Sequence, residues 1–109
     1  MSSPLIRLAS TVFLSVFAVA TASATPPETL ATKAGCLACH SKDKKLFGPP
    51  FHEVAAKYKG DAKAPPKLAA HVRSGSKGIW GNKAIMIPVT TKQIGDADLA
   101  TVIDWVLMQ

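Results

Sequence analysis

Hydrophobic residues are distributed in two different ways along this chain. Near the N-terminus they form one continuous apolar stretch over residues 8–20, whereas beyond residue 25 they recur at the i, i+3, i+4, i+7 spacing of one helix face. The clearest face is formed by Leu99, Val102, Ile103, Val106 and Leu107. It predicts a C-terminal helix with Asp96 and Asp98 in its first turn, where the helix dipole favours negative charge.

Three further helices are predicted from the same spacing and from their start and stop residues. The first spans Pro26–Ala34, with Thr25 as the N-cap and Pro26 in the first turn. The second is marked by Phe51, Val54, Ala55 and Tyr58 and stops at Gly60; the third covers Pro66–Ser74. We therefore predict an all-α fold of about four short helices.

The remaining segments are predicted to be ordered loops. Residues 46–50 and 75–91 are rich in glycine and proline, and no segment alternates apolar and polar residues as a half-buried strand does. There is no internal repeat and no low-complexity tract. The pattern favours one small domain.

The apolar N-terminal stretch is predicted to belong to a secretory signal peptide of residues 1–24. Arg7 precedes it, and Ala22-Ser23-Ala24 after it is an A-x-A cleavage box, so the mature chain begins at Thr25. The stretch is shorter than the ~20 apolar residues of a spanning helix, and we expect no stable insertion in a membrane. Removing 24 of the 109 residues leaves 85, enough for one domain.

The charge of the chain is basic, with 13 Lys and Arg against 7 Asp and Glu. Nucleic acid is a common partner of basic chains, but no basic stripe interleaved with aromatic residues is present here, and the leader predicts export. Most lysines are expected to be solvated surface. Some are expected to steer acidic partners toward the site described next.

Both cysteines lie in one pentapeptide, Cys36-Leu37-Ala38-Cys39-His40. C-x-x-C-H is the attachment signature of a c-type haem, in which the two thiols form thioethers with the porphyrin vinyl groups and the histidine ligates iron. A redox dithiol belongs near a βαβ pattern, a zinc site needs four suitably spaced ligands, and a disulfide here closes a very short loop. The sequence favours one covalent haem c with His40 as a metal ligand.

A second axial ligand decides what such an iron does. The candidates in the mature chain are Met86, Met108, His52 and His71. Met86 lies in a loop far enough from His40 for the chain to wrap round the ring, whereas His52 lies close to the proximal side and Met108 ends the last helix. The alternative for Met86 is an ordinary core contact. We expect Met86 to be the ligand.

The mature chain resembles the small bacterial class I cytochromes c of the short-chain periplasmic type. The resemblance rests on Gly35–His40, Gly48-Pro49, the run Arg73–Gly81, Met86 and Asp104–Leu107. It implies the class I cytochrome c fold, four short helices wrapped around one haem, over residues 25–109. It also implies that the Pro49 carbonyl accepts a hydrogen bond from His40, that the Trp80 indole donates to a haem propionate, and that Met86 ligates iron.

Three positions depart from the family pattern. Ile85 replaces the proline that often precedes the ligating methionine, which leaves the rigidity of that loop open. Ala31 stands where the family commonly packs an aromatic residue in the first helix. His71 stands where the family tends to place an arginine near a propionate, so that its charge there depends on pH.

The function that this resemblance implies is electron transfer in the periplasm by an electron carrier that is not an enzyme. The expected donor is a membrane cytochrome complex or a dehydrogenase, and the expected acceptor is a terminal reductase or oxidase; the chain is expected to be a monomer that binds no nucleic acid. A haem peroxidase-like enzyme or a gas-binding sensor is the alternative, and either one needs an open distal site in place of a bound Met86.

Overall fold

The computed structural model describes residues 14–20 and 23–109 of the chain. Most of the predicted signal peptide, including Ala22 of its cleavage box, lies outside the described residues. Within 14–20 no helix or strand forms, and the side chains of Leu14, Val16, Phe17 and Val19 are between 83% and 90% exposed. None of the described helices is long and apolar enough to cross a membrane.

The four predicted helices are confirmed, with small changes at their ends. They are α1 (Pro27–Lys33), α2 (Phe51–Lys57), α3 (Ala64–Ser74) and α4 (Asp96–Leu107). The first helix starts one residue later than predicted because Pro26, not Thr25, is its N-cap, and α3 starts two residues earlier at Ala64. After α2, Gly60 adopts a positive φ of 78° and the chain turns there, as its position in the sequence predicted.

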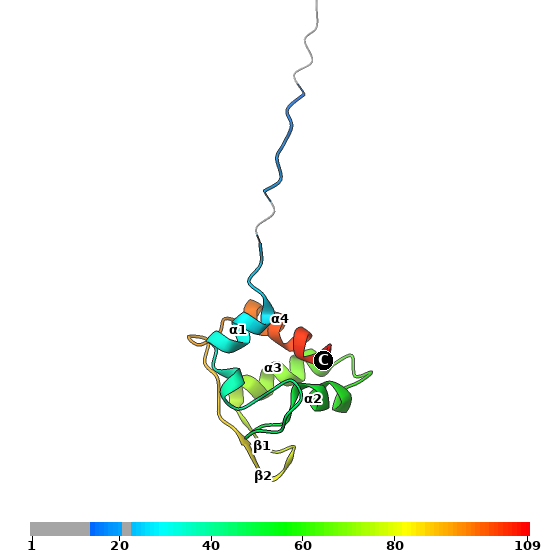
Figure 1. Cartoon of the computed structure of the whole chain (residues 1–109), viewed down its shortest axis with the longest axis vertical. Coiled ribbons are helices and arrows are strands. Elements are labelled where there is room, and N and C mark those ends of the chain that lie inside the picture. Colours follow the sequence, from blue (N-terminus) through cyan, green and yellow to red (C-terminus); the bar gives the residue numbers. More distant parts are fainter. Residues whose placement is uncertain (1–13, 21–22) are drawn as a thin grey trace, which may run out of the picture.

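Helix α4 is the centre of the hydrophobic core. It packs against α1, α2 and α3, and α1 and α4 lie side by side in Figure 1. Four of the five predicted face residues, Leu99, Val102, Ile103 and Val106, are buried, and Leu107 is half-buried. The i, i+3, i+4, i+7 spacing therefore placed this helix correctly against the rest of the chain.

The loop predicted over residues 75–91 is the main correction. It contains a two-stranded antiparallel sheet of β1 (Ser76–Gly78) and β2 (Gly81–Met86), which pairs Ser76 with Met86 and Lys77 with Ile85. The hairpin projects from the helices at the end away from α1 (Figure 1). Because it buries neither face fully, its sequence lacks the strong alternation that marks a half-buried strand. Gly78 and Gly81, with φ of 78° and 114°, allow the turn between the strands.

Candidate haem site

The haem-attachment motif begins with a short 3₁₀ helix over Cys36–Ala38. Gly35 ahead of it has a φ of 85°, which lets the chain turn sharply out of α1. The backbone N–H groups of Cys39 and His40 both donate to the Cys36 carbonyl, at 3.2 and 3.0 Å. The two cysteines and the histidine are thus held together in a single turn.

The two thiols differ in their surroundings. Cys36 is half-buried and packs against the hydrophobic core, whereas Cys39 is exposed; neither is in a disulfide. Burial raises the pKa of the Cys36 thiol above its ordinary value of 9.0, so this group is protonated at neutral pH. A thiol carries the hydrogen that its addition to a vinyl group requires.

The loop after His40 folds back over the histidine. The Gly48 N–H donates to the Cys39 carbonyl at 2.8 Å, and the Phe51 N–H donates to the Ser41 carbonyl at 2.8 Å. Through this return the Pro49 carbonyl reaches His40, and its oxygen lies 2.8 Å from the imidazole Nδ1. The hydrogen bond that the resemblance implied is therefore present.

This hydrogen bond determines the chemical form of the imidazole. A carbonyl oxygen only accepts, so the Nδ1 of His40 carries the proton and Nε2 keeps a free lone pair. The ring also stacks on Phe51, with centroids 5.3 Å apart and an interplanar angle of 18°. His40 therefore presents, in a fixed orientation, an Nε2 whose lone pair is able to bind a metal ion.

Gly48 allows this close packing because it has no side chain. A Cβ added at Gly48 would lie 2.5 Å from Cε1 and 2.8 Å from Nδ1 of His40. Real Cβ contacts are essentially never this short, so the loop reaches the imidazole only with glycine at this position.

A cavity of about 700 Å³ lies between the loop of residues 41–50 that follows His40, here called the proximal loop, α2 and the hairpin. Its lining includes two predicted site residues, Pro49 and Trp80. The other lining residues are Lys45, Phe47, Glu53, Gly81, Asn82, Lys83 and Ala84. Its volume lies within the usual range of roughly 300–1,000 Å³ for sites that hold small molecules and cofactors.

The remaining predicted residues, Trp80 and Met86, both lie on the hairpin. Trp80 is half-buried in the hairpin turn, and the Lys57 ammonium lies 5.2 Å from its ring centroid. Met86 ends β2 and is half-buried. It follows the cavity-lining Ala84 by two residues, and side chains two apart on a strand point to the same side. Ile85 between them is 64% exposed.

The competing ligand candidates lie elsewhere. His52 is exposed, and its Nδ1 lies 3.0 Å from the Lys42 carbonyl oxygen, which ties it to the proximal loop. Met108 is 75% exposed after the last turn of α4. His71 is half-buried on α3. Within residues 14–20 and 23–109, no three His, Cys, Asp or Glu side chains cluster as a metal site.

Several cavity residues were not identified from the sequence. Glu53 lines the cavity from α2, and Phe47, which is 87% exposed, lines it from the proximal loop. A glutamate on a short helix and a phenylalanine in a Gly/Pro-rich loop are ordinary in a sequence. Their role depends on how α2 and the hairpin face each other, which no local pattern encodes.

The residues present fit a covalent haem. Two thiols and an imidazole with a free Nε2 share one turn, and a cavity of suitable size opens beside the loop that fixes this imidazole. The cytochrome c family model matches residues 26–109. The chain therefore belongs to the cytochrome c family, whose cofactor is covalent haem c.

Comparison with individual relatives shows which kind of cytochrome c this chain resembles. The chain is 55% identical to cytochrome c2 of Rubrivivax gelatinosus over 84 residues, 77% of this chain and 96% of that protein. It is 41% identical to cytochrome c-551 of Pseudomonas aeruginosa over 83 residues, 76% of either chain. The crystal structure of wild-type cytochrome c552 from Nitrosomonas europaea matches with a TM-score of 0.67 and 38% identity, over 73% of this chain and 95% of that one.

These relatives identify a small bacterial class I monohaem cytochrome c. The predicted fold class is confirmed: mostly helical with one small sheet. The chain is an electron carrier that serves redox partners, and it is not an enzyme. The comparisons give no support to the peroxidase-like or gas-sensor alternatives.

Proposed function

We propose that this cytochrome carries one electron at a time on a haem that Cys36 and Cys39 hold through thioethers and that His40 and Met86 ligate. The observation that carries the proposal is the hydrogen bond between His40 and the Pro49 carbonyl, because it leaves Nε2 free to bind iron. The position of Met86, on the same side of β2 as Ala84 of the cavity, supports its role as the second ligand.

The proposed roles of the surrounding residues follow from their positions. Trp80 lines the cavity and its indole N–H is a donor, so we assign it to a haem propionate. A His/Met-ligated haem supplies a one-electron couple whose thioether ligand raises the reduction potential and whose full coordination leaves no vacancy for a substrate. His40 and Met86 would hold such a haem from the protein side, and the couple it supplies would need no change of ligands.

Replacement of Met86 by alanine tests this assignment. The oxidised wild-type protein is expected to show a weak near-infrared charge-transfer band that Met86→Ala abolishes, and the variant is expected to have a lower reduction potential. Met108→Ala is the matched control, because Met108 is 75% exposed and its loss should change neither property. A high-spin spectrum in the resting wild type would contradict the proposal.

We also assign the protein to the periplasm, with residues 1–24 as a leader cleaved after Ala24 and residues 25–109 as the haem domain. The short apolar stretch followed by the box Ala22-Ser23-Ala24 supports this, because that pattern is typical of a cleaved secretory signal peptide. N-terminal sequencing of the exported protein should start at Thr25; a start at Met1 would oppose cleavage.

The proposed partners are a membrane cytochrome complex or dehydrogenase as donor and a terminal reductase or oxidase as acceptor. Lys45 and Lys83 line the cavity and place positive charge beside the proposed haem, which supports docking of acidic partners there. Such contacts are expected to be small and transient, formed by a monomer.

A further inference from the structure

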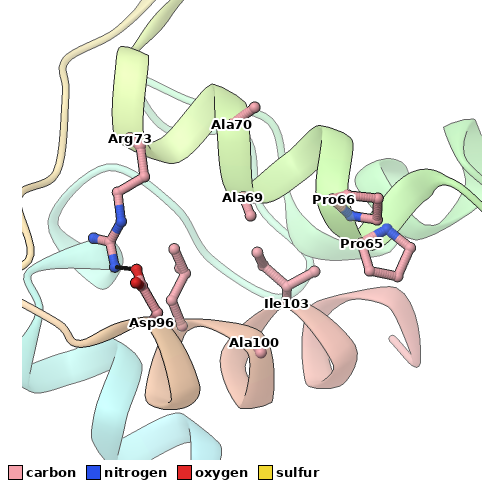
Figure 2. A pocket seen from close by; sticks show the side chains of 9 residues that line it. Pro65, Pro66, Ala69, Ala70, Arg73, Asp96, Ala100 and Ile103 are labelled. Atoms are coloured by element: carbon pink, nitrogen blue, oxygen red, sulfur yellow. Dashed lines mark hydrogen bonds and ion pairs between the residues drawn. The ribbon is translucent and has the colours of Figure 1, made fainter.

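Arg73 joins the end of α3 to the stretch from Val89 to Asp96, which follows it much later in the sequence. It lies in the last turn of α3, and its side chain is 22% exposed. Nη1 donates to the Val89 carbonyl at 3.2 Å, and Nη2 donates to the Ile94 carbonyl at 2.9 Å and to Asp96 Oδ1 at 2.7 Å. Figure 2 shows its contact with Asp96, at one end of a groove between α3 and α4.

The segment that Arg73 holds is the one that follows Met86. The Val89 N–H donates to the Val72 carbonyl at 2.9 Å, so the amide and the carbonyl of Val89 are both bonded to the end of α3. Gly75 brings the same helix end against Met86, because a Cβ there would lie 2.7 Å from the Met86 carbonyl oxygen. Main-chain positions on both sides of Pro88 are therefore docked on α3.

The carbonyl contacts of Arg73 matter more than its ion pair. Asp96 is 86% exposed, and ion pairs in water contribute little to stability. The Val89 and Ile94 carbonyls instead accept from a cationic, partly buried donor, and hydrogen bonds to charged groups are among the stronger ones. The guanidinium fork binds two separate carbonyls, which a single ammonium does less well.

We propose that Arg73 is a positioning residue that keeps the Met86 segment closed over the haem iron. This inference rests on the proposed ligation by Met86. The rigidity that a proline before the methionine would give is absent at Ile85. Arg73 supplies it from α3, by fixing the chain on the C-terminal side of the ligand.

The binding of imidazole to the oxidised holoprotein measures this closure. An external ligand binds iron only when Met86 has left, so its apparent affinity is proportional to the open fraction. Arg73→Gln removes both charged carbonyl contacts and is expected to raise the apparent affinity for imidazole about tenfold. The near-infrared band should be lost at correspondingly lower imidazole concentration. Arg73→Lys keeps one charged donor, so it should raise the imidazole affinity less than Arg73→Gln does. If the glutamine variant does not hold its haem, the lysine variant alone tests the role of Arg73.

Three controls separate positioning from general stability. Lys67→Gln removes an ion pair with Asp61 from the other end of α3, and Asp96→Asn removes only the ion pair of Arg73; both should change the affinity less than about twofold. Val106→Ala weakens the core at the far end of α4 and should leave imidazole affinity unchanged.

The outcomes distinguish the proposed ligation of iron by Met86 from the proposed positioning role of Arg73. If Met86→Ala abolishes the band and Arg73→Gln binds imidazole as the wild type does, the role of Arg73 is overturned while the ligation stands. An affinity increase in Val106→Ala as large as in Arg73→Gln also overturns it, because opening then follows global stability. A wild-type band that is absent or that survives in Met86→Ala overturns the ligation and the inference that rests on it.

Discussion

His40 shows how the neighbours of one residue set its chemistry. Pro49 determines which nitrogen carries the proton, Phe51 stacks on the ring, and Gly48 leaves room against the ring near Cε1. Phe51 in turn meets Trp105 of α4 edge-on, with centroids 5.4 Å apart. The imidazole is thereby connected through one aromatic ring to the main core helix.

Gly48→Ala is expected to disturb this arrangement. Its new Cβ would lie 2.5 Å from the His40 ring, so the ring or the Pro49 loop must move and the 2.8 Å hydrogen bond must lengthen. We expect a loss of about 1–3 kcal/mol in the free energy of unfolding, as for other overpacked sites, measured by denaturant titration.

Gly95→Ala is the matched control for this substitution. Gly95 has a φ of −69°, which any residue adopts, and a Cβ there meets no atom within 4 Å. Its effect should be within about 0.5 kcal/mol. Equal stabilities of Gly48→Ala and the wild type would show that the loop adapts to the added methyl group.

At the scale of elements, the helices follow from local sequence and the hairpin does not. The face of α4 is encoded by residues within three turns of each other, so its burial was predictable from Leu99 to Val106. The hairpin that pairs Ser76 with Met86 is accompanied by contacts of its second strand and the following residues with Gly75 and Val72 at the end of α3. Those contacts join α3 to a later part of the chain, so a local sequence pattern does not encode them.

The contact between α1 and α4 explains why alanine occupies position 31. Ala31 is fully buried, with 0% exposure, within the core cluster that includes Val102 and Val106. An aromatic residue, which the family commonly places here, has no space in this packing. The small side chain of Ala31 therefore allows α1 and α4 to pack closely.

Ala31→Phe is expected to destabilise the protein for this reason. Overpacking of a full core costs about 1–3 kcal/mol, and 1 kcal/mol lowers the Tm of a domain of this size by roughly 4–8 °C. Lys33→Phe, on the exposed side of α1, is the control and should leave the Tm nearly unchanged. If the Tm of Ala31→Phe equals or exceeds that of the wild type, α1 and α4 can move apart to admit the ring without loss of stability.

At the scale of the whole molecule, charge governs encounters with partners. Removal of the proposed leader takes away Arg7 and no acid, so the formal net charge of the polypeptide falls from +6 to +5. Lys45 and Lys83 bring part of this charge to the rim of the cavity. Lys57 adds another cation beside Trp80. We therefore expect the field to attract anionic partners to the side at which the haem is proposed to lie.

The rate of oxidation of the reduced protein by hexacyanoferrate(III) should therefore fall as ionic strength rises. Screening lengths shrink from about 10 Å at 0.1 M salt to about 3 Å at 1 M, so the attraction is largely lost over this range. A Lys45→Gln/Lys83→Gln variant should react several-fold more slowly at low salt in stopped-flow measurements. Lys59→Gln, which does not line the cavity, is the control. Rates independent of salt would argue against electrostatic steering.

The sequence by itself determined the features that depend on neighbouring residues. Cys36, Cys39 and His40 predicted the haem because their chemistry lies within one turn, and helical spacing predicted four helices because it is set by the helix itself. The tertiary structure decided which side chains surround the cavity, how Pro49 meets His40, and that Arg73 links α3 to the segment after Met86. These contacts join residues separated by several to many positions, so they depend on how complete elements pack.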